Sequence, residues 1–217
     1  MIKLHKLPEP EYLSQNVALW TVRLAERRAL GEAPTVHELS RYNHPDIKLA
    51  LIAETAGKCA YCEAKILHVA YGDIEHIVPK SLGDEFRFQW SNLTIACDIC
   101  NTKKSNYDGI VDPYNDDVES IFSFIGPIIY PTDGEAAGYR TYVILDLNRQ
   151  DLREKRYDRI SYIETLLEIY RRTTDADIAK ILKDDLINRE LADTTEFAAA
   201  ARSFVRARAP EIFETAA

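Results

Sequence analysis

Residues 59–104 read CAYCEAKILHVAYGDIEHIVPKSLGDEFRFQWSNLTIACDICNTKK and contain all four cysteines of the 217-residue chain. The cysteines form two Cys-x-x-Cys pairs, Cys59 with Cys62 and Cys97 with Cys100. This spacing is typical of tetrahedral zinc ligation, in which four thiolates leave no open position for a substrate. We therefore predict a structural zinc site that joins the two ends of the stretch. Two disulfides, or four unrelated buried thiols, are the alternative interpretations.

The residues between the two cysteine pairs predict a strand, a loop, a second strand and a helix, in that order. Asp73–Val78 is strand-like and ends before Pro79, which cannot donate a ladder hydrogen bond. Residues 80–91 form a polar and aromatic loop, and Leu93–Ala96 is a short second strand. The helix follows the turn at the second cysteine pair and runs through Lys104, which makes the unit ββα.

Polar side chains of this unit suit phosphodiester hydrolysis, which requires a base for the attacking water and a divalent ion for the charge on the phosphate. Glu75 and His76 are adjacent near the end of the first strand. Adjacent strand residues point to opposite faces, so a break in strand geometry near Pro79 has to bring both to one site. Asn101 follows the second cysteine pair, where its amide oxygen can complete a metal site with Glu75. Asn92 lies where the loop enters the second strand and can hold that loop by hydrogen bonds to the backbone.

The runs DIEHIVPK (residues 73–80) and WSNLTIACDICNTKKSN (residues 90–106) resemble the ββα-metal motif of HNH endonucleases, in the branch that carries two Cys-x-x-Cys pairs. The resemblance implies that His76 is the general base and that Glu75 and Asn101 hold a catalytic Mg²⁺ or Mn²⁺. The last ligand position is His in the motif's name, but the amide oxygen of Asn also suits a hard cation.

The same resemblance implies roles for three more residues. Asn92 matches the middle Asn of the motif, which shapes the loop. Lys103 and Lys104 match basic positions that approach phosphate.

Segments beyond the central motif carry a narrower resemblance. They are GKCAYCE (57–63), VDPYND (111–116) and LDLNRQDLREKR (145–156). Together with IEHIVPK they resemble the PtuB-like HNH effectors of Septu-type and retron-associated anti-phage systems. This resemblance implies DNA as the substrate and an ABC/SMC-like, PtuA-like ATPase as the partner. DNA rather than RNA rests on the resemblance alone, because nothing in the sequence reads a 2′-hydroxyl.

The composition indicates a globular protein with an acidic balance. Apolar residues make up 46% of the chain, and 27 basic against 35 acidic residues give a net charge of −8. This charge argues against a free-standing nucleic-acid binder, so either the cations are locally concentrated or a partner supplies part of the DNA contact. The N-terminus has no apolar signal region and no apolar run spans a bilayer, so we expect a cytoplasmic protein with reduced thiols.

We expect an α+β fold in which a mainly helical scaffold surrounds the central ββα-metal unit with its four-cysteine zinc site and a small β-hairpin. The expected segments are an N-terminal helical segment (1–58), the HNH core (59–107), a loop and hairpin (108–148) and a C-terminal helical segment (149–217).

The flanks are predicted from apolar spacing and capping residues. Before the core, we expect a helix with Leu13 and Trp20 inside, a short helix from Pro34 to Leu39, and a third helix that His44 or Asn43 caps. Within the core, Ile66, Leu67 and Val69 predict a short hairpin, His68 is interpreted as a surface residue of that hairpin, and Asp73 is either support for the metal site or a plain hairpin residue.

After the core, Ile121–Ile129 and Tyr139–Leu147 predict the two strands of the small hairpin. Asn148 is predicted to cap a long helix, and a helix from Thr173 or Thr174 is predicted to bury Ile178 and Ile181. A last helix carries Arg202, Arg206 and Arg208, which we interpret as a solvated face.

Two hypotheses from different classes follow. The first is a metal-dependent HNH DNA endonuclease that acts as the nuclease effector of an anti-phage system; one active site per chain favours nicking, successive nicks or cleavage by a homodimer. The second is a non-catalytic zinc-knuckle module that binds nucleic acid or protein. Mere binding does not require the set of His76, Glu75, Asn92 and Asn101, which favours the enzyme. An RNase with the same site is a variant of the first hypothesis.

Overall fold

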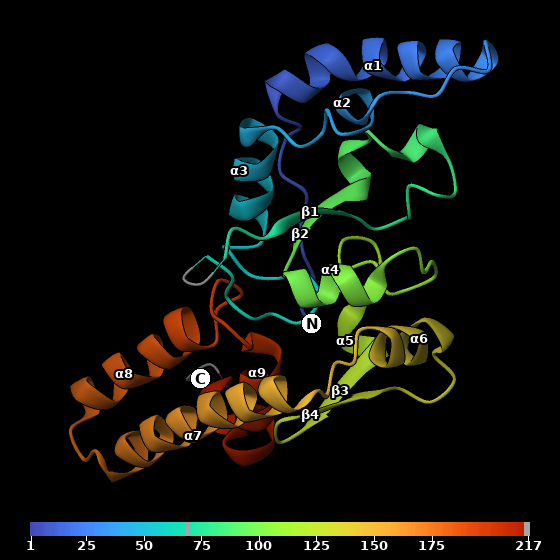
Figure 1. The fold of residues 1–217 in the computed structure, drawn as a ribbon. Helices are drawn as coiled ribbons and strands as arrows, with labels where there is room; N and C mark the ends of the chain where they lie inside the picture. The colour runs from blue at the N-terminus through green and yellow to red at the C-terminus, as the bar shows by residue number, and fades with distance from the viewer. Residues whose placement is uncertain (68–69, 215–217) are drawn as a thin grey trace. The chain divides into compact units, whose positions relative to one another are not determined.

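The computed structural model describes residues 1–67 and 70–214, which form two compact units. One unit consists of Leu4–Tyr61 and Lys65–Asp116. The other consists of Met1–Lys3, Cys62–Ala64 and the chain from Asp117 onward. Most elements of the described residues are helices (Figure 1), and the strands among these residues form two antiparallel pairs, which confirms the expected α+β fold class. Among the described residues, no helix combines the length and the apolar character that a membrane span requires.

The first unit contains three N-terminal helices, a pair of strands and one short helix. Its elements are α1 (Glu11–Ala29), α2 (Val36–Leu39), α3 (Pro45–Glu54), β1 (Asp73–His76), the 3-10 turns η1 (Asp84–Phe86) and η2 (Trp90–Asn92), β2 (Leu93–Ala96) and α4 (Asp98–Lys104). The capping residues explain where the helices begin. Thr35 and Glu38 form a reciprocal capping box at α2, and His44 caps α3, whose first residue is Pro45. The three predicted N-terminal helices are therefore confirmed.

The strands β1 and β2 pair antiparallel, with Glu75 opposite Thr94 and His76 opposite Leu93. All four residues of β2 are buried, and α4 follows β2 directly. The predicted order of strand, loop, strand and helix is confirmed, although β1 ends at His76, two residues earlier than expected.

The short hairpin expected after the first cysteine pair is absent from the described part of this segment. An antiparallel bridge joins Lys58 to Lys65, and no strand lies between Lys65 and β1 in the residues that the structure describes. His68 and Val69, which were assigned to that hairpin, lie outside the described residues.

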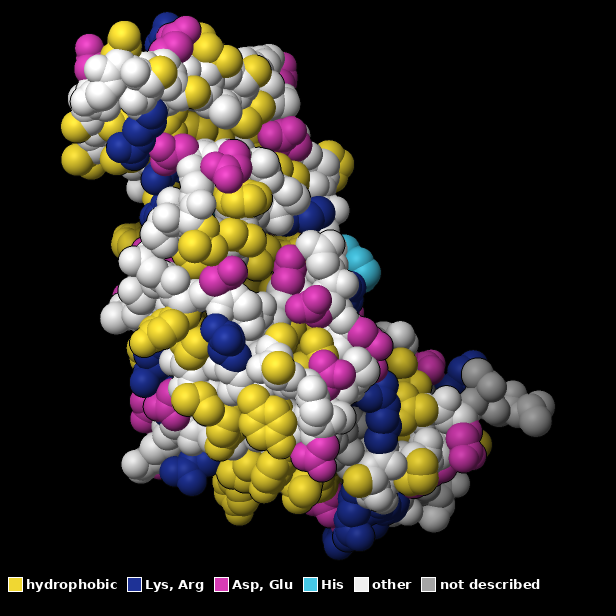
Figure 2. Space-filling view, turned by 90° about the vertical axis from the view of Figure 1, so that its right-hand side faces the viewer, with side chains coloured by type: hydrophobic (Ala, Val, Ile, Leu, Met, Phe, Trp, Pro, Cys, Tyr) yellow, Lys and Arg dark blue, Asp and Glu magenta, His cyan; other side chains and the backbone are white. Residues whose placement is uncertain are grey.

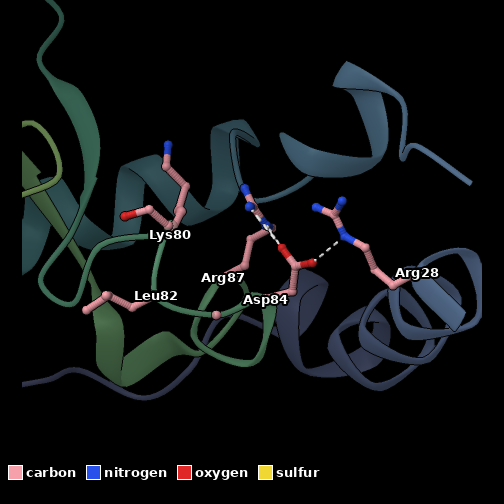
Figure 3. Close-up of a pocket in the computed structure, with 7 residues that line it drawn as sticks. Arg28, Lys80, Leu82, Asp84 and Arg87 are labelled. Atoms are coloured by element: carbon pink, nitrogen blue, oxygen red, sulfur yellow. Dashed lines mark hydrogen bonds and ion pairs between the residues drawn. The ribbon is translucent and has the colours of Figure 1, made fainter. Parts of the chain in front are cut away.

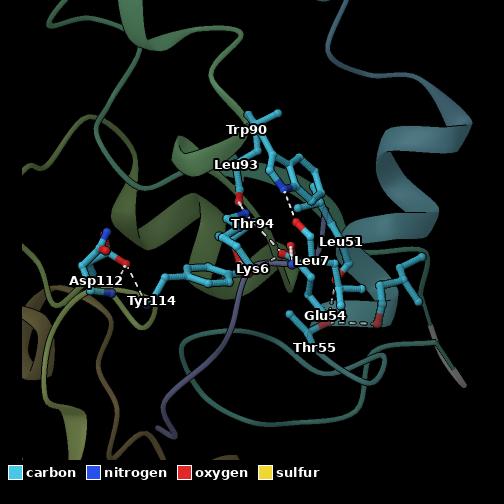
Figure 4. Close-up of polar contacts among 12 residues, drawn as sticks. Lys6, Leu7, Leu51, Glu54, Thr55, Trp90, Leu93, Thr94, Asp112 and Tyr114 are labelled. Carbon is cyan, nitrogen blue, oxygen red and sulfur yellow. Dashed lines mark hydrogen bonds and ion pairs between the residues drawn. The ribbon is translucent and has the colours of Figure 1, made fainter. Parts of the chain in front are cut away.

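An extended N-terminal segment lies against β2 through buried polar contacts (Figure 4). The ammonium group of Lys6 lies 4.3 Å from the centre of the Trp90 ring and 4.2 Å from that of Tyr114, and it pairs with Glu54. The same ammonium group donates to the carbonyl of Leu93 on β2. These cation–π and charged contacts compensate for the desolvation of Lys6, and burial lowers the pKa of its ammonium group.

The second unit is mostly helical and has its own core. Its elements are α5 (Val118–Ile121), β3 (Phe122–Ile125), β4 (Ile128–Pro131), α6 (Ala136–Ile144), α7 (Gln150–Arg172), α8 (Ala176–Asp185), the π-turn η3 (Leu186–Glu190), α9 (Ala198–Arg208) and the 3-10 turn η4 (Pro210–Ile212). Ile163 and Leu167 of α7 pack with Leu186, Leu191 and Val205 in this core. The contacts bury the apolar stripe of α7 as its helical spacing predicts.

The small hairpin is present, but the prediction of its strands was wrong. The strand β3 lies within the stretch Ile121–Ile129 that was assigned to the first strand, and β4 begins within it, because a turn at Gly126, with φ of +56°, folds the chain back. Tyr139–Leu147, assigned to the second strand, instead lies in α6 and its C-terminal turn. There Thr141 and Leu145 are buried four residues apart, a helical spacing that the aromatic and β-branched residues around them concealed.

Two predictions about the C-terminal helices were also wrong. Asn148 does not cap α7, because its side-chain amide accepts from the N–H of Ile129 and donates to the carbonyl of the same residue on β4. Asp175 rather than a threonine caps α8, and Ile178 and Ile181 are 50% and 65% exposed. The core takes up the residues that follow α8, beginning with Leu186.

The sulfur atoms of Cys59, Cys62, Cys97 and Cys100 all lie within 4.8 Å of one another. A tetrahedral zinc ion with Zn–S bonds of about 2.3 Å requires sulfur atoms about 3.8 Å apart, so this cluster fits zinc. Three of the four cysteines are buried, which suits a closed structural site. A zinc ion bound there would fix the start of α4 to the segment that follows Gly57.

Removal of this zinc site is expected to unfold the core. Cys59→Ser is expected to lose bound zinc and to lower the free energy of unfolding by several kcal/mol, because metal binding and folding are coupled at such sites. Zinc content by elemental analysis and thermal melting would test this, with Thr102→Ser on the exposed side of α4 as a control. A Cys59→Ser protein that melts like the unaltered chain would contradict a structural role for zinc.

Candidate active site

Three oxygen-bearing side chains of the ββα unit line one pocket of about 300 Å³. The residues that line this pocket, called here the Glu75 pocket, are Tyr42, Asn43, Lys48, Asp73, Ile74, Glu75, Lys80 and Asn101. Asp73 and Glu75 are two positions apart on β1 and therefore point to the same face. Asn101, in the first turn of α4, donates from its amide nitrogen to Asp73 at 2.8 Å. This bond orients the amide and leaves its oxygen as a ligand of the kind that hard cations prefer.

Glu75 is held by a buried lysine from α4. The ammonium group of Lys104, which is fully buried, lies 2.9 Å from a carboxylate oxygen of Glu75 and donates to the carbonyl of His76 at 2.7 Å. Burial raises the pKa of Glu75, and the attraction of Lys104 offsets only part of that rise.

These contacts place the two lysines of the motif in different environments. Lys104 was expected to approach phosphate, but its ammonium group faces Glu75 and the backbone, and a phosphate would have to displace that pair. Lys103 is half-buried and makes contacts of its own.

The two ring nitrogens of His76 differ in their contacts with the described residues. Its Nε2 lies 2.9 Å from the carbonyl oxygen of Arg87. Because a carbonyl only accepts, Nε2 must carry the hydrogen, and the lone pair of the neutral ring is then on Nδ1. Nδ1 is buried and makes no hydrogen bond to the described residues. Burial lowers the pKa of His76 to about 3, so the ring is neutral at physiological pH.

His76 and Glu75 do not line the same pocket. Glu75 lines the oxygen-rich pocket, whereas His76, the next residue on β1, is 1% exposed and does not line it. Tyr42 connects the two environments, because it lines the Glu75 pocket and its ring meets the imidazole edge-on, with ring centres 4.6 Å apart. Lys80 donates to the Tyr42 hydroxyl at 2.9 Å. In this structure the Tyr42 ring therefore packs on the imidazole at the border of the pocket.

Asn92 lies at the end of the loop between the strands and binds the backbone on both sides of it. Its oxygen accepts from the N–H of Val78 at 2.7 Å, and its nitrogen donates to the carbonyls of Val78 and Phe86 at 3.0 Å each. These bonds hold the loop that presents the carbonyl of Arg87 to His76.

Sequence reasoning missed Tyr42, Lys48 and Lys80 as residues of the site. Lys80 is the last residue of the run DIEHIVPK, so the motif itself contains a signal for this residue. Tyr42 and Lys48 precede the ββα unit, and no motif within residues 59–104 points to them.

The burial of His76 predicts its behaviour in a pH titration. The pKa of about 3 in the folded chain lies below the ordinary 6.5, so the ring is expected to stay neutral from pH 8 down to pH 5. The unfolded chain takes up this proton at higher pH, so acid progressively destabilises the fold as pH falls from about 6.5 towards 3.

NMR of the histidine ring carbons would test this, with His76→Gln to assign the signal. A His76 signal that shifts with a midpoint near pH 6.5 in the folded protein would contradict the burial described above.

Comparison with known proteins agrees with this geometry. Residues 59–107 match the family model of HNH endonucleases. The chain is also 33% identical over 115 residues to a Septu protein PtuB from Bacillus thuringiensis. That alignment covers 52% of this chain and 45% of the relative, so the chain spans less than half the length of the curated protein it matches. The central segment thus matches the HNH endonuclease family model and carries a four-cysteine cluster, in a chain that is similar to a PtuB protein over about half of its length.

Proposed function

We propose that the chain is a metal-dependent DNA endonuclease in which His76 activates the water that attacks a phosphodiester bond. The observation that carries the proposal is the state of His76. Its Nε2 donates to a backbone carbonyl, and its Nδ1, which is buried beside an oxygen-rich pocket, has no hydrogen-bond partner among the described residues. A histidine with only a packing role has no need of this asymmetry, whereas a general base needs one nitrogen oriented and the other available.

The oxygen donors of the Glu75 pocket fit a divalent ion of the Mg²⁺ or Mn²⁺ type. Asp73, Glu75 and Asn101 supply carboxylate and amide oxygens, and Lys104 lies 2.9 Å from one of the two Glu75 oxygens. A bound ion would stabilise the negative charge on the scissile phosphate and the leaving oxygen. The zinc site has a different role, since four thiolates leave no position for substrate.

A bound phosphate also favours proton uptake by His76. Burial and the nearby cations Lys80, Arg87 and Lys104 all lower the pKa of the imidazole. A phosphate between these cations and the ring adds negative charge, which raises that pKa towards the range of an effective base. Since Nδ1 is buried, the side chains around it must shift before water can reach it, and Tyr42 is the neighbour that also lines the pocket.

We further propose that this nuclease is a cytoplasmic effector of an anti-phage system and works with an ABC/SMC-like ATPase. The similarity to a Septu protein PtuB supports this placement. The charge of the chain supports a partner, because a net charge of −8 opposes DNA binding. On the face drawn in Figure 2, basic side chains occur in small groups among acidic ones. Arg202, Arg206 and Arg208 each lie near an acidic side chain, which removes most of their positive field.

The catalytic proposal predicts that His76→Ala abolishes nicking of supercoiled plasmid in Mg²⁺ or Mn²⁺. Loss of a general base lowers the rate by about 10²–10⁴-fold, while the zinc content stays unchanged. His37→Ala, in the exposed part of α2, is the matched control and should nick like the unaltered chain.

Nicking that persists in His76→Ala would refute the role of His76. If neither protein nicks plasmid, the nicking assay of the unaltered chain and of His76→Ala is repeated in the presence of the co-purified ATPase. Anti-phage protection that survives both His76→Ala and Asn101→Ala but not Cys59→Ser would identify a non-catalytic zinc-knuckle module instead.

A further inference from the structure

A second pocket adjoins the Glu75 pocket and carries positive charge (Figure 3). It has a volume of about 390 Å³, and the residues that line it are Arg28, Lys80, Ser81, Leu82, Gly83, Asp84 and Arg87. Lys80 lines both pockets, so they meet at its side chain. The second pocket is called here the Arg28 pocket.

One carboxylate holds two guanidinium groups in the Arg28 pocket. Asp84 accepts from Nε of Arg28 at 2.9 Å with one oxygen, and from Nε and a terminal nitrogen of Arg87 at 3.1 and 3.0 Å with the other. Figure 3 shows the two arginines on either side of this carboxylate. With Lys80, three cations and one anion line the pocket, and the carboxylate of Glu85 lies against the lining residue Gly83, so a net positive charge remains.

The donors of the two arginines differ in availability. Arg87 is 9% exposed and its side chain is used by Asp84 and by the carbonyl of Leu39. The side chain of Arg28 is 53% exposed, and within residues 1–67 and 70–214 only its Nε donates, to Asp84. Figure 3 shows its two terminal nitrogens directed away from the carboxylate. Asp84 therefore fixes the base of the Arg28 fork, while the end of the fork can donate to a ligand.

The position of the Arg28 pocket suits a DNA strand. A strand with one phosphate in the Glu75 pocket can continue past Lys80, which lines both pockets. A planar guanidinium with two parallel donors matches the oxygens of a phosphate, and most protein contacts to DNA are made with phosphate and sugar. The same loop presents the Arg87 carbonyl that orients His76, so a phosphate in the Arg28 pocket is held in register with the base.

We propose that the Arg28 pocket binds a DNA backbone phosphate next to the scissile one, with Arg28 as the residue that donates to it. This inference rests on the proposed endonuclease function and extends it to a residue of α1, which lies outside the HNH-matched residues 59–107. The N-terminal helical segment is then part of the substrate site as well as scaffold.

Binding of a short fluorescein-labelled DNA duplex, followed by anisotropy at increasing salt, tests this inference without cleavage. All variants are made in the full-length chain that carries His76→Ala. Arg28→Gln is expected to weaken binding about tenfold and to reduce the slope of log affinity against log salt by about 1, the loss of one phosphate contact. Arg28→Lys is expected to restore the slope, because it restores the charge. Arg153→Gln, which removes an exposed cation from α7, is the charge-matched control and should bind normally.

Equal binding by the Arg28→Gln and Arg153→Gln variants would overturn the inference, as would the absence of DNA binding by the chain that retains Arg28. Equal melting temperatures of the variants would show that Arg28→Gln acts on binding and not on folding. If nicking depends on His76 but Arg28→Gln binds DNA normally, the proposed DNA-binding role of the Arg28 pocket is rejected and the endonuclease proposal stands. Weakened binding by Arg28→Gln together with nicking that persists in His76→Ala would keep the Arg28 pocket and remove the proposed role of His76.

Discussion

The buried ammonium group of Lys104 connects the helix of the ββα unit to its first strand. A charge without access to water is tolerated only when its hydrogen bonds are satisfied, and here a carboxylate and a backbone carbonyl of β1 satisfy them. Cys97 and Cys100 fix the other end of α4 through the sulfur cluster. A helix of seven residues is unstable in isolation, so α4 exists because both of its ends are fixed. The position of Asn101 relative to Glu75, and thus the oxygen pocket, follows from these two attachments.

The candidate cation ligand Glu75 and the candidate base His76 lie on opposite faces of one strand, β1. Glu75 faces the pocket that suits a cation, and His76 faces the loop whose carbonyl fixes its tautomer. The expected break in strand geometry does not bring the two side chains into one pocket. Instead, Tyr42 from the segment between α2 and α3 contacts both environments. The helical N-terminal segment therefore contributes directly to the site.

The central unit could be predicted from sequence because its signals are local. The order of its elements follows from features that lie within about forty residues of one another. These features are the two cysteine pairs, a strand that ends before Pro79 and a short apolar strand of four residues. The second strand of the hairpin was misplaced because the aromatic and β-branched residues of Tyr139–Leu147 masked a helical spacing. Tyr42 was missed because only tertiary packing brings it to the site. The burial of Lys104 had a signal in the sequence, because Lys104 lies four residues after the buried Cys100 and therefore on the same face of the helix.

The N-terminal segment that places Lys6 between two aromatic rings has a consequence for the kinetics of folding. Lys6 and Leu93 are 87 positions apart in the chain, and Leu7, which accepts from the indole N–H of Trp90, is 83 positions from its partner. Leu4 likewise donates to the carbonyl of Pro113. Contacts of such large sequence separation close late, because a long loop must be ordered before they form. During synthesis the first residues of the chain can therefore make these contacts only after more than a hundred further residues have been added. The first unit cannot complete its core until Tyr114 has left the ribosome.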